Sequence, residues 1–125
     1  MICGIGTDMV KISRIESALD KRGERFAQRI LSPTEFSHFQ QAHSPACHLA
    51  KRFAAKEAVS KALGTGIGVI SWHDIEVYND GKGAPGVHFY GNAAQKMAQL
   101  GAARAWLSLS DEGDYALAFA VISAS

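Results

Sequence analysis

The sequence predicts an α+β fold in which an antiparallel sheet packs against one long helix and several shorter helices. Residues 46–63 are rich in Ala, Lys and Leu and contain neither Gly nor Pro, which indicates a helix of about five turns. The segment 79–83, NDGKG, separates two β-type segments and is typical of a hairpin turn, which favours antiparallel pairing. A strongly apolar segment over residues 115–122 indicates a final strand.

Caps and glycines set the limits of the other elements. Ser13 followed by Glu16 predicts a capping box and a helix that begins near residue 14 and ends at Gly23. The run from Ser32 to Glu35 predicts another helix start, with serine as N-cap, proline at N1 and glutamate at N3. Helices are expected over residues 14–22, 24–31, 33–41, 46–63 and 92–100. Strands are expected over residues 1–10, 70–78, 87–90, 105–110 and 115–122.

Length and charge place the chain among ordinary globular proteins. With 125 residues, 47% hydrophobic and 20% charged, it is expected to form a single domain over residues 1–125. Net charge is +1, but residues 1–66 carry ten Lys and Arg against six Asp and Glu, whereas residues 67–125 carry three against six. The positive first half suits an acidic partner or an anionic ligand. The asymmetry is too weak to indicate nucleic acid.

Cysteine content and hydropathy bear on the compartment. Cys3 and Cys47 are too few for a disulfide framework or a zinc site, so buried free thiols are expected. The N-terminus lacks the charged and apolar regions of a signal peptide, and no apolar run is long enough to cross a bilayer. The expected location is the cytoplasm, with no membrane partner.

The segment 53–68, FAAKEAVSKALGTGIG, holds the strongest functional signal in the chain. Glu57 and Lys61 are one helical turn apart, so their side chains share a helix face. Gly64 favours a left-handed helix cap, and the loop 65–68 offers backbone N–H groups of the kind that cradle phosphate. The order is reversed relative to a P-loop, because this loop meets the negative end of the helix dipole. A phosphate bound there needs positive charge from Lys61 and from a metal held by Glu57.

Asp8, at the end of the first strand, is the candidate second metal ligand. A pair of carboxylates suits Mg²⁺, which takes few protein carboxylates and keeps waters and phosphate oxygens in its shell. Structural interpretations remain open for each residue. Glu57 and Lys61 could form a solvated pair worth about 0.3–0.5 kcal/mol, Asp8 could serve a turn, and the glycine loop could be a cap alone. The five histidines show no ligand spacing.

Three segments carry a family resemblance: GIGTDMVKISRIE near the N-terminus, RFAAKEAVSKALGTGIG in the centre and SLSDEGDYALAFAVI near the C-terminus. With them the chain resembles, over almost its whole length, the holo-acyl-carrier-protein synthases, small 4'-phosphopantetheinyl transferases of lipid synthesis. The resemblance implies that family's fold and an enzyme that moves the phosphopantetheine arm of coenzyme A onto a serine of apo acyl carrier protein. Adenosine 3',5'-bisphosphate would be released. It also implies a homotrimer with active sites between subunits.

The resemblance further implies roles for individual residues. Asp8 and Glu57 match the magnesium ligands, and Lys61 matches the lysine that meets the pyrophosphate. Arg52 matches a basic residue near the 3'-phosphate of coenzyme A. Contacts with coenzyme A are also expected at Gly64, Thr65 and Gly66. Contacts with acyl carrier protein are expected at Arg14, Lys21, Arg22 and Arg25 of the basic first helix.

Proton transfer and one departure from the family pattern complete the expectations. The attacking serine hydroxyl must lose its proton, and Glu57 is the candidate base, directly or through a water on the metal. Many family members carry histidine after the S-x-S of the penultimate strand, where this chain has Asp111. An ionised aspartate cannot donate to a phosphate, so Lys51, Arg52 or another subunit is expected to supply that charge. A noncatalytic module that binds a nucleotide or an acidic protein, and a purely structural trimer, are the competing interpretations.

Overall fold

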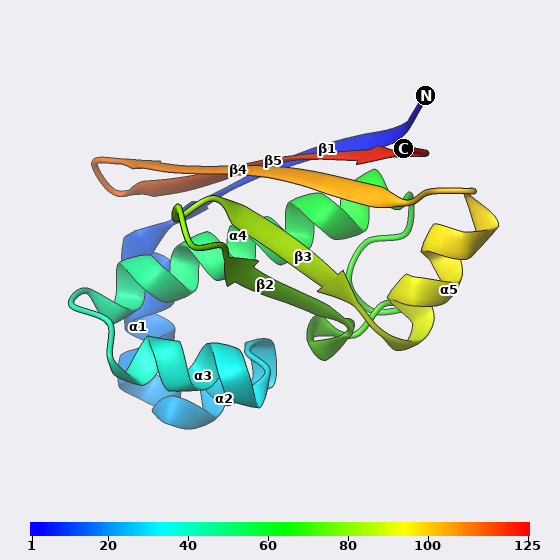
Figure 1. Cartoon of the computed structure of the whole chain (residues 1–125). Coiled ribbons are helices and arrows are strands. Elements are labelled where there is room, and N and C mark those ends of the chain that lie inside the picture. Colours follow the sequence, from blue (N-terminus) through cyan, green and yellow to red (C-terminus); the bar gives the residue numbers. More distant parts are fainter.

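Two antiparallel sheets, five α-helices and one short 3-10 helix make up the fold in the computed structural model, which describes residues 1–125 (Figure 1). The helices are α1 (Ile12–Arg22), α2 (Glu24–Ile30), α3 (Pro33–Gln40), α4 (Pro45–Ala62), the 3-10 helix η1 (Trp72–Asp74) and α5 (Gly91–Gln99). The strands are β1 (Ile2–Lys11), β2 (Ile75–Asn79), β3 (Pro85–Phe89), β4 (Arg104–Glu112) and β5 (Tyr115–Ser123). The predicted α+β class is confirmed.

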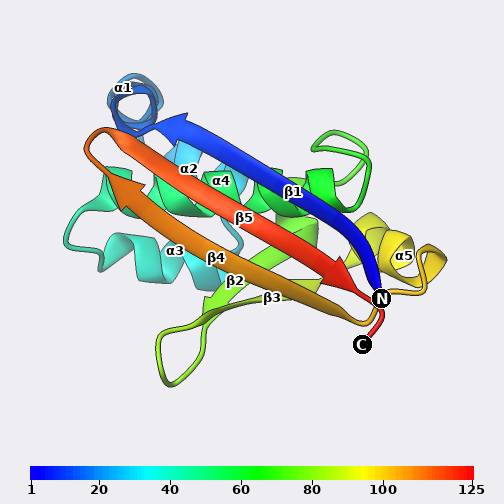
Figure 2. The same ribbon diagram turned by 90° about the horizontal axis from the view of Figure 1, so that it is seen from above.

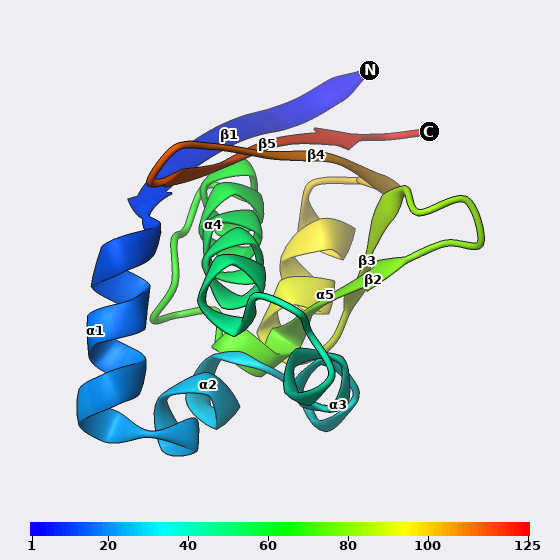
Figure 3. The same cartoon turned by 90° about the vertical axis from the view of Figure 1, so that its left-hand side faces the viewer.

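The three-stranded sheet has the order β1-β5-β4, so the last strand of the chain lies between the first strand and β4 (Figure 2). Both pairings are antiparallel, and Asp8 lies opposite Ala118 on the central strand. Helix α4 runs beneath this sheet, with α1 on one side and the β2–β3 hairpin on the other (Figure 3). The first and last strands of the chain therefore belong to the sheet that covers one side of α4.

Small residues let α4 approach the sheet closely. Gly4 and Gly6 on β1 face the helix, and a Cβ atom at either would fall on a helix carbonyl oxygen, that of Ala62 or of Ala58. Because side chains alternate along a strand, Asp8 shares the helix-facing side of β1 with the two glycines. Close packing thus brings a carboxylate to the flank of α4. The facing side of β5 presents the fully buried alanines Ala116, Ala118 and Ala120.

The opposite face of the three-stranded sheet is apolar and uncovered. Its large side chains are between 43% and 63% exposed. They alternate with the helix-facing residues and come from all three strands: Ile5, Met9, Trp106, Leu117 and Phe119. An exposed apolar face of this kind marks an interaction surface more often than a free one.

The capping box predicted at Ser13 and Glu16 does not form. Helix α1 begins earlier, at Ile12, and its N-cap is Lys11, which makes no side-chain cap. The Ser13 backbone N–H and hydroxyl donate instead to the Asp114 carboxylate, at 3.0 and 2.6 Å. Ser13 therefore ties α1 to the turn between β4 and β5, a long-range partner that local spacing cannot predict.

The strand expected over residues 70–78 is shorter than predicted and begins only at Ile75. Ser71 and Asp74 form a capping box around η1, which takes up residues 72–74 in a 3-10 turn. The capping box predicted at Ser32 and Glu35 does form, at the start of α3.

Both cysteines are free, and each is only half-buried. No helix of the chain combines the length and the apolar character that spanning a bilayer requires. The cytoplasmic location stays a prediction.

The close approach of α4 predicts that Gly6→Ala destabilises the fold. The added methyl would overlap the Ala58 carbonyl oxygen, and overpacking of this kind costs about 1–3 kcal/mol. Denaturant unfolding compares this variant with Gly81→Ala, because a Cβ at Gly81 meets no atom within 4 Å. Equal unfolding midpoints for the two variants would contradict the packing argument.

Candidate active site

Asp8 and Lys61 are brought together by the packing of β1 on α4. Lys61 Nζ lies 3.0 Å from Asp8 Oδ1 and also donates to the Thr7 carbonyl oxygen at 3.1 Å. The Asp8 side chain is 17% exposed, whereas that of Lys61 is about half exposed. Their separation of 53 residues means that tertiary packing makes this pair.

Glu57 lies on the flank of α4 that faces Asp8, but it forms no ion pair. The solvated pair that its spacing from Lys61 allows is absent, because Lys61 reaches Asp8 instead. Burial and, second, the negative charge of Asp8 raise the pKa of Glu57 above its ordinary value, and Lys61 opposes that rise. Two carboxylates that repel each other, one of them desolvated, form a site that a divalent cation would stabilise.

A cleft of about 460 Å³ opens beside the two carboxylates. Its walls come from β1, α1, α2 and α4. Phe26 and Phe53 supply apolar surface, and Arg14 and Arg22 supply positive charge. This combination suits a ligand that carries both phosphate and apolar groups.

The glycine loop after α4 closes on the helix and does not leave its N–H groups free. Gly64 N–H donates to the Lys61 carbonyl oxygen at 2.9 Å, and the N–H groups of Thr65 and Gly66 donate to that of Ser60 at 3.2 and 3.1 Å. Gly64 and Gly66 have φ values of +84° and +77°, which a helix C-cap requires. The expectation of an uncovered phosphate cradle is wrong for these residues, because the last helix carbonyls need the same donors. Contact between this loop and a ligand stays a prediction.

A second cavity, of about 590 Å³, lies on another side of α4 and is bordered by the β2–β3 hairpin and β4. Arg52 is only 6% exposed and donates through Nη2 to Asn79 Oδ1 at 2.6 Å, while its Nε has no partner. At the rim, Lys51 Nζ lies 2.7 Å from Asp111 Oδ1. Burial, with the charge of Arg52 second, lowers the pKa of His48 to about 4, so this histidine is neutral at pH 7. The cavity thus holds a buried cation with an unused donor.

The predicted carrier-protein residues divide between two helices. Arg14, Lys21 and Arg22 line a groove along α1. Arg25 lies on α2, beyond Gly23, so it does not belong to the first helix as expected. All four side chains are exposed.

Sequence analysis missed a buried ion pair next to Glu57. Lys56 Nζ lies 2.6 Å from Glu35 Oε1, and neither side chain is more than 1% exposed. The sequence contains part of this information, because Lys56 follows Leu49 at the spacing of the buried face of the helix. A lysine in that stripe indicates a buried partner, but nothing local identifies Glu35, 21 residues away.

Comparison with known proteins assigns the family. The sequence profile of the 4'-phosphopantetheinyl transferase superfamily matches residues 4–120. The chain belongs to this superfamily.

Relatives of this superfamily match the chain along its length. It is 53% identical over 123 residues to the holo-[acyl-carrier-protein] synthase of Halorhodospira halophila, and the match covers 98% of each chain. The crystal structure of the Neisseria meningitidis holo-[acyl-carrier-protein] synthase is 50% identical, has a TM-score of 0.90, and is matched over 98% of this chain and 99% of that one. The Helicobacter pylori synthase, solved in complex with coenzyme A, is 34% identical with a TM-score of 0.83, over 95% of this chain and 99% of that one. The resemblance and the enzyme class expected from the sequence are confirmed.

The geometry of this phosphopantetheinyl transferase predicts that Asp8→Asn lowers the pKa of Glu57. The substitution removes the repulsion, but the larger cause, burial, remains, so the pKa should fall and still exceed the ordinary value. A carbon-13 NMR titration of the Glu57 carboxyl carbon measures it, and Glu57→Gln identifies the resonance. An unchanged pKa would show that the two carboxylates do not interact.

Proposed function

We propose that the chain transfers the 4'-phosphopantetheine group of coenzyme A to a serine of apo acyl carrier protein, with release of adenosine 3',5'-bisphosphate. The observation that carries the proposal is the convergence of Asp8, Glu57 and Lys61 beside one cleft in a chain of this superfamily. Relatives named holo-[acyl-carrier-protein] synthase, some of them solved with coenzyme A, support the choice of both substrates.

Magnesium is the metal that this donor set fits. Asp8 and Glu57 offer only oxygen ligands, and no group of three or more His, Cys, Asp or Glu side chains converges anywhere in the chain. A site with few protein ligands leaves coordination positions to waters and substrate oxygens, as Mg²⁺ prefers. When bound between the two carboxylates, the ion would supply positive charge to the pyrophosphate of coenzyme A.

The chain's own residues supply the other parts of the reaction. Lys61, on an exposed and flexible stem beside Asp8, can reach a nonbridging phosphate oxygen. Glu57 is the proposed base, directly or through a water on the metal, because its carboxylate lines the cleft. As the serine oxygen bonds to phosphorus, its proton passes to Glu57 and the bond to the nucleotide phosphate breaks.

The cavity around Arg52 is the proposed site of the nucleotide end of coenzyme A. Arg52 lines this cavity and is hydrogen-bonded to the neutral amide of Asn79, so a 3'-phosphate would supply the guanidinium with an anionic partner. Asp111 is engaged by Lys51, which supports Arg52 rather than Asp111 as the phosphate contact. The cations on α1 and α2 are the proposed contacts for the acidic carrier protein.

The arrangement of the two cavities supports an active site shared between subunits. Arg52 and Glu57 are five positions apart on α4, hence about 140° apart around the helix, and the two cavities share no lining residue. A smaller cavity, formed by Ile5, Gly6, Thr7, Lys61 and Phe119, connects the uncovered sheet face to Lys61. A neighbouring subunit seated on that face could bring its own Arg52 cavity toward Lys61. We propose that the enzyme is a homotrimer assembled in this way.

Transfer itself is tested by intact-mass measurement of apo acyl carrier protein incubated with the chain, coenzyme A and magnesium. The carrier protein should gain one phosphopantetheine group. Asp8→Ala and Glu57→Ala should each lower kcat by about 100-fold or more, through loss of charge stabilisation and of the base. Glu112→Ala, which removes an exposed carboxylate outside both cavities, is the matched control. Binding of coenzyme A without any transfer would support a noncatalytic module instead.

The same assay separates the two substrate surfaces. Arg52→Gln should raise the KM for coenzyme A by about tenfold, the value of one charge-assisted hydrogen bond, and leave the KM for carrier protein unchanged. Charge reversal at Lys21 and Arg25, which do not line the cleft beside Glu57, should do the opposite, and added salt should weaken its effect. If either change raised the KM for both substrates, the assignment of the two surfaces would be wrong.

Assembly is tested by placing a charge on the uncovered sheet face. Phe119→Asp should give a monomer in light scattering and abolish transfer, because a buried unpaired carboxylate opposes association. Val69→Asp is the control, since Val69 is 69% exposed but lies in the loop after α4, outside the sheet. A wild-type chain that is monomeric yet fully active would refute the shared site.

A further inference from the structure

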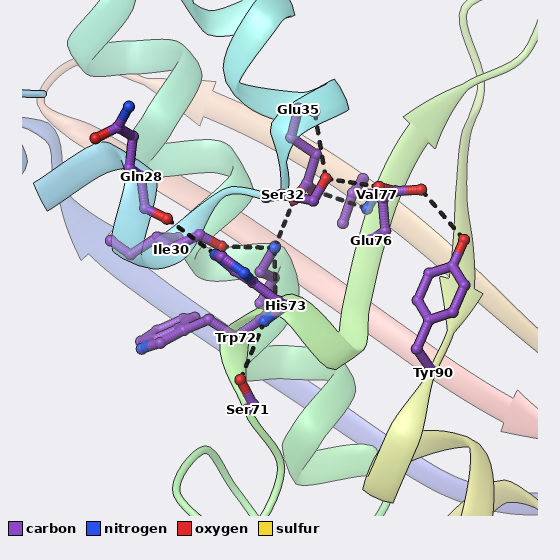
Figure 4. Close-up of polar contacts among 11 residues, drawn as sticks. Gln28, Ile30, Ser32, Glu35, Ser71, Trp72, His73, Glu76, Val77 and Tyr90 are labelled. Atoms are coloured by element: carbon purple, nitrogen blue, oxygen red, sulfur yellow. Dashed lines mark hydrogen bonds and ion pairs between the residues drawn. The ribbon is translucent and has the colours of Figure 1, made fainter. Parts of the chain in front are cut away.

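A buried lysine next to Glu57 ties α4 to three other segments. Lys56 Nζ donates to the Ile30 carbonyl oxygen at 2.7 Å, to Glu35 Oε1 at 2.6 Å and to the Trp72 carbonyl oxygen at 2.9 Å. An ammonium group has three N–H donors, so each of them has an acceptor here. Figure 4 shows Ile30, Glu35 and Trp72 converging from the end of α2, from α3 and from η1.

The junction extends through Glu35 to further backbone groups. Glu35 Oε1 also accepts from the Ser32 N–H, and Oε2 accepts from the Val77 N–H, both at 2.8 Å. The four segments that meet at Lys56 and Glu35 are therefore α2, α3, β2 with η1, and α4. Apolar residues often replace a buried ion pair without loss of stability. Stability alone therefore does not account for this pair, whereas fixed placement of the four segments does.

One aromatic wall of the cleft, Phe26, belongs to a segment that Lys56 holds, and the other, Phe53, lies on α4 and packs on such a segment. Phe26 lies on α2, one helical turn before Ile30, whose carbonyl accepts from Lys56. Phe53 packs on the ring of Trp72, with centroids 5.0 Å apart, and Trp72 also accepts from Lys56. Both phenylalanines line the cleft together with Glu57. The junction thus sets how far Phe26 lies from Glu57, and through Trp72 it sets the orientation of the Phe53 ring.

We propose that Lys56 is a positioning residue for phosphopantetheine transfer, and that its junction with Ile30, Glu35 and Trp72 fixes the position of Phe26 and the orientation of the Phe53 ring beside Glu57. The inference rests on the proposed function, because the transfer rate is its readout. Without Lys56, α2 and η1 can shift relative to α4. A displacement of about 1 Å in a reacting geometry can cost on the order of 100-fold in rate. The Arg52 cavity has no lining residue from α2 or η1, so nucleotide binding should survive.

Lys56→Met tests the proposal at a temperature where circular dichroism shows the variant folded. The expected result is a fall in kcat of about tenfold or more, with a KM for coenzyme A within about threefold of wild type. Transfer by the wild-type chain, measured in the same experiment, distinguishes a failure of the proposed function from a failure of the positioning role. Absence of transfer by the wild-type chain overturns the proposed function, whereas wild-type kcat in Lys56→Met overturns only the positioning role.

Two further variants distinguish positioning from stability. Lys56→Met leaves Glu35 buried and unpaired, which destabilises the fold, and Lys56→Met with Glu35→Gln removes that stranded charge. The melting temperature of the double variant should recover only in part, because an amide in place of the Glu35 carboxylate has one acceptor oxygen for the N–H groups of Ser32 and Val77. Its kcat should stay low, because the links to Ile30 and Trp72 are still missing. Where the single variant does not fold, the double variant carries the test.

Met97→Ala supplies the matched control, since Met97 is 7% exposed on α5 and makes none of the junction's hydrogen bonds. It should lose stability and keep its kcat. Recovery of kcat in parallel with the melting temperature in the double variant, or an equal loss of kcat in Met97→Ala, would overturn the positioning role.

Discussion

The contact between α4 and the two glycines of β1 is the constraint on which the active site depends. Gly4 and Gly6 leave no room for a side chain against the helix carbonyls. Strand alternation then fixes the direction of Asp8, because it is two residues beyond Gly6 on the same side. A helix held further from the sheet would part Lys61 from Asp8 and weaken the interaction of Asp8 with Glu57. The relative positions of Asp8, Glu57 and Lys61 therefore depend on the close backbone packing between α4 and β1.

Electrostatics around the end of α4 favours cations there. The C-terminal end of a helix carries partial negative charge, and the N–H groups of Gly64, Thr65 and Gly66 are already used to satisfy helix carbonyls. An anionic pyrophosphate there meets a helix dipole of the wrong sign and two carboxylates. Lys61 offsets one negative charge at most. The proposed divalent cation at Asp8 and Glu57 would offset the remaining negative charge.

The sequence was most informative where structure follows from local chemistry. The Ser32 capping box, the hairpin turn after Asn79 and the helix cap at Gly64 all depend on neighbouring residues, and all three form. Local spacing failed where a distant partner competes. Ser13 binds Asp114 rather than Glu16, and Lys61 binds Asp8 rather than Glu57.

The same limit explains what sequence analysis missed in the site. Helical spacing alone could mark Lys56 as a charged residue in a buried stripe, but its partners lie at the ends of three other elements. The place of Arg52 in its cavity depends on how the β2–β3 hairpin folds over α4, since Asn79 accepts from its Nη2. Motif resemblance assigned Arg52 a phosphate role, and the fold adds that its charge has no carboxylate partner within 4 Å.

The placement of Arg52 and Glu57 on α4 also bears on the proposed assembly. It carries Arg52 toward one cavity and Glu57 toward another, so one chain presents the two halves of the proposed site on different sides of the same helix. A ligand that needs both halves can use one chain only by passing around α4, whereas two chains in contact can face the halves toward each other. The uncovered face that carries Phe119 continues into a cavity that Lys61 lines. Burial of that face against a second copy would remove apolar area from water and complete the site in one step.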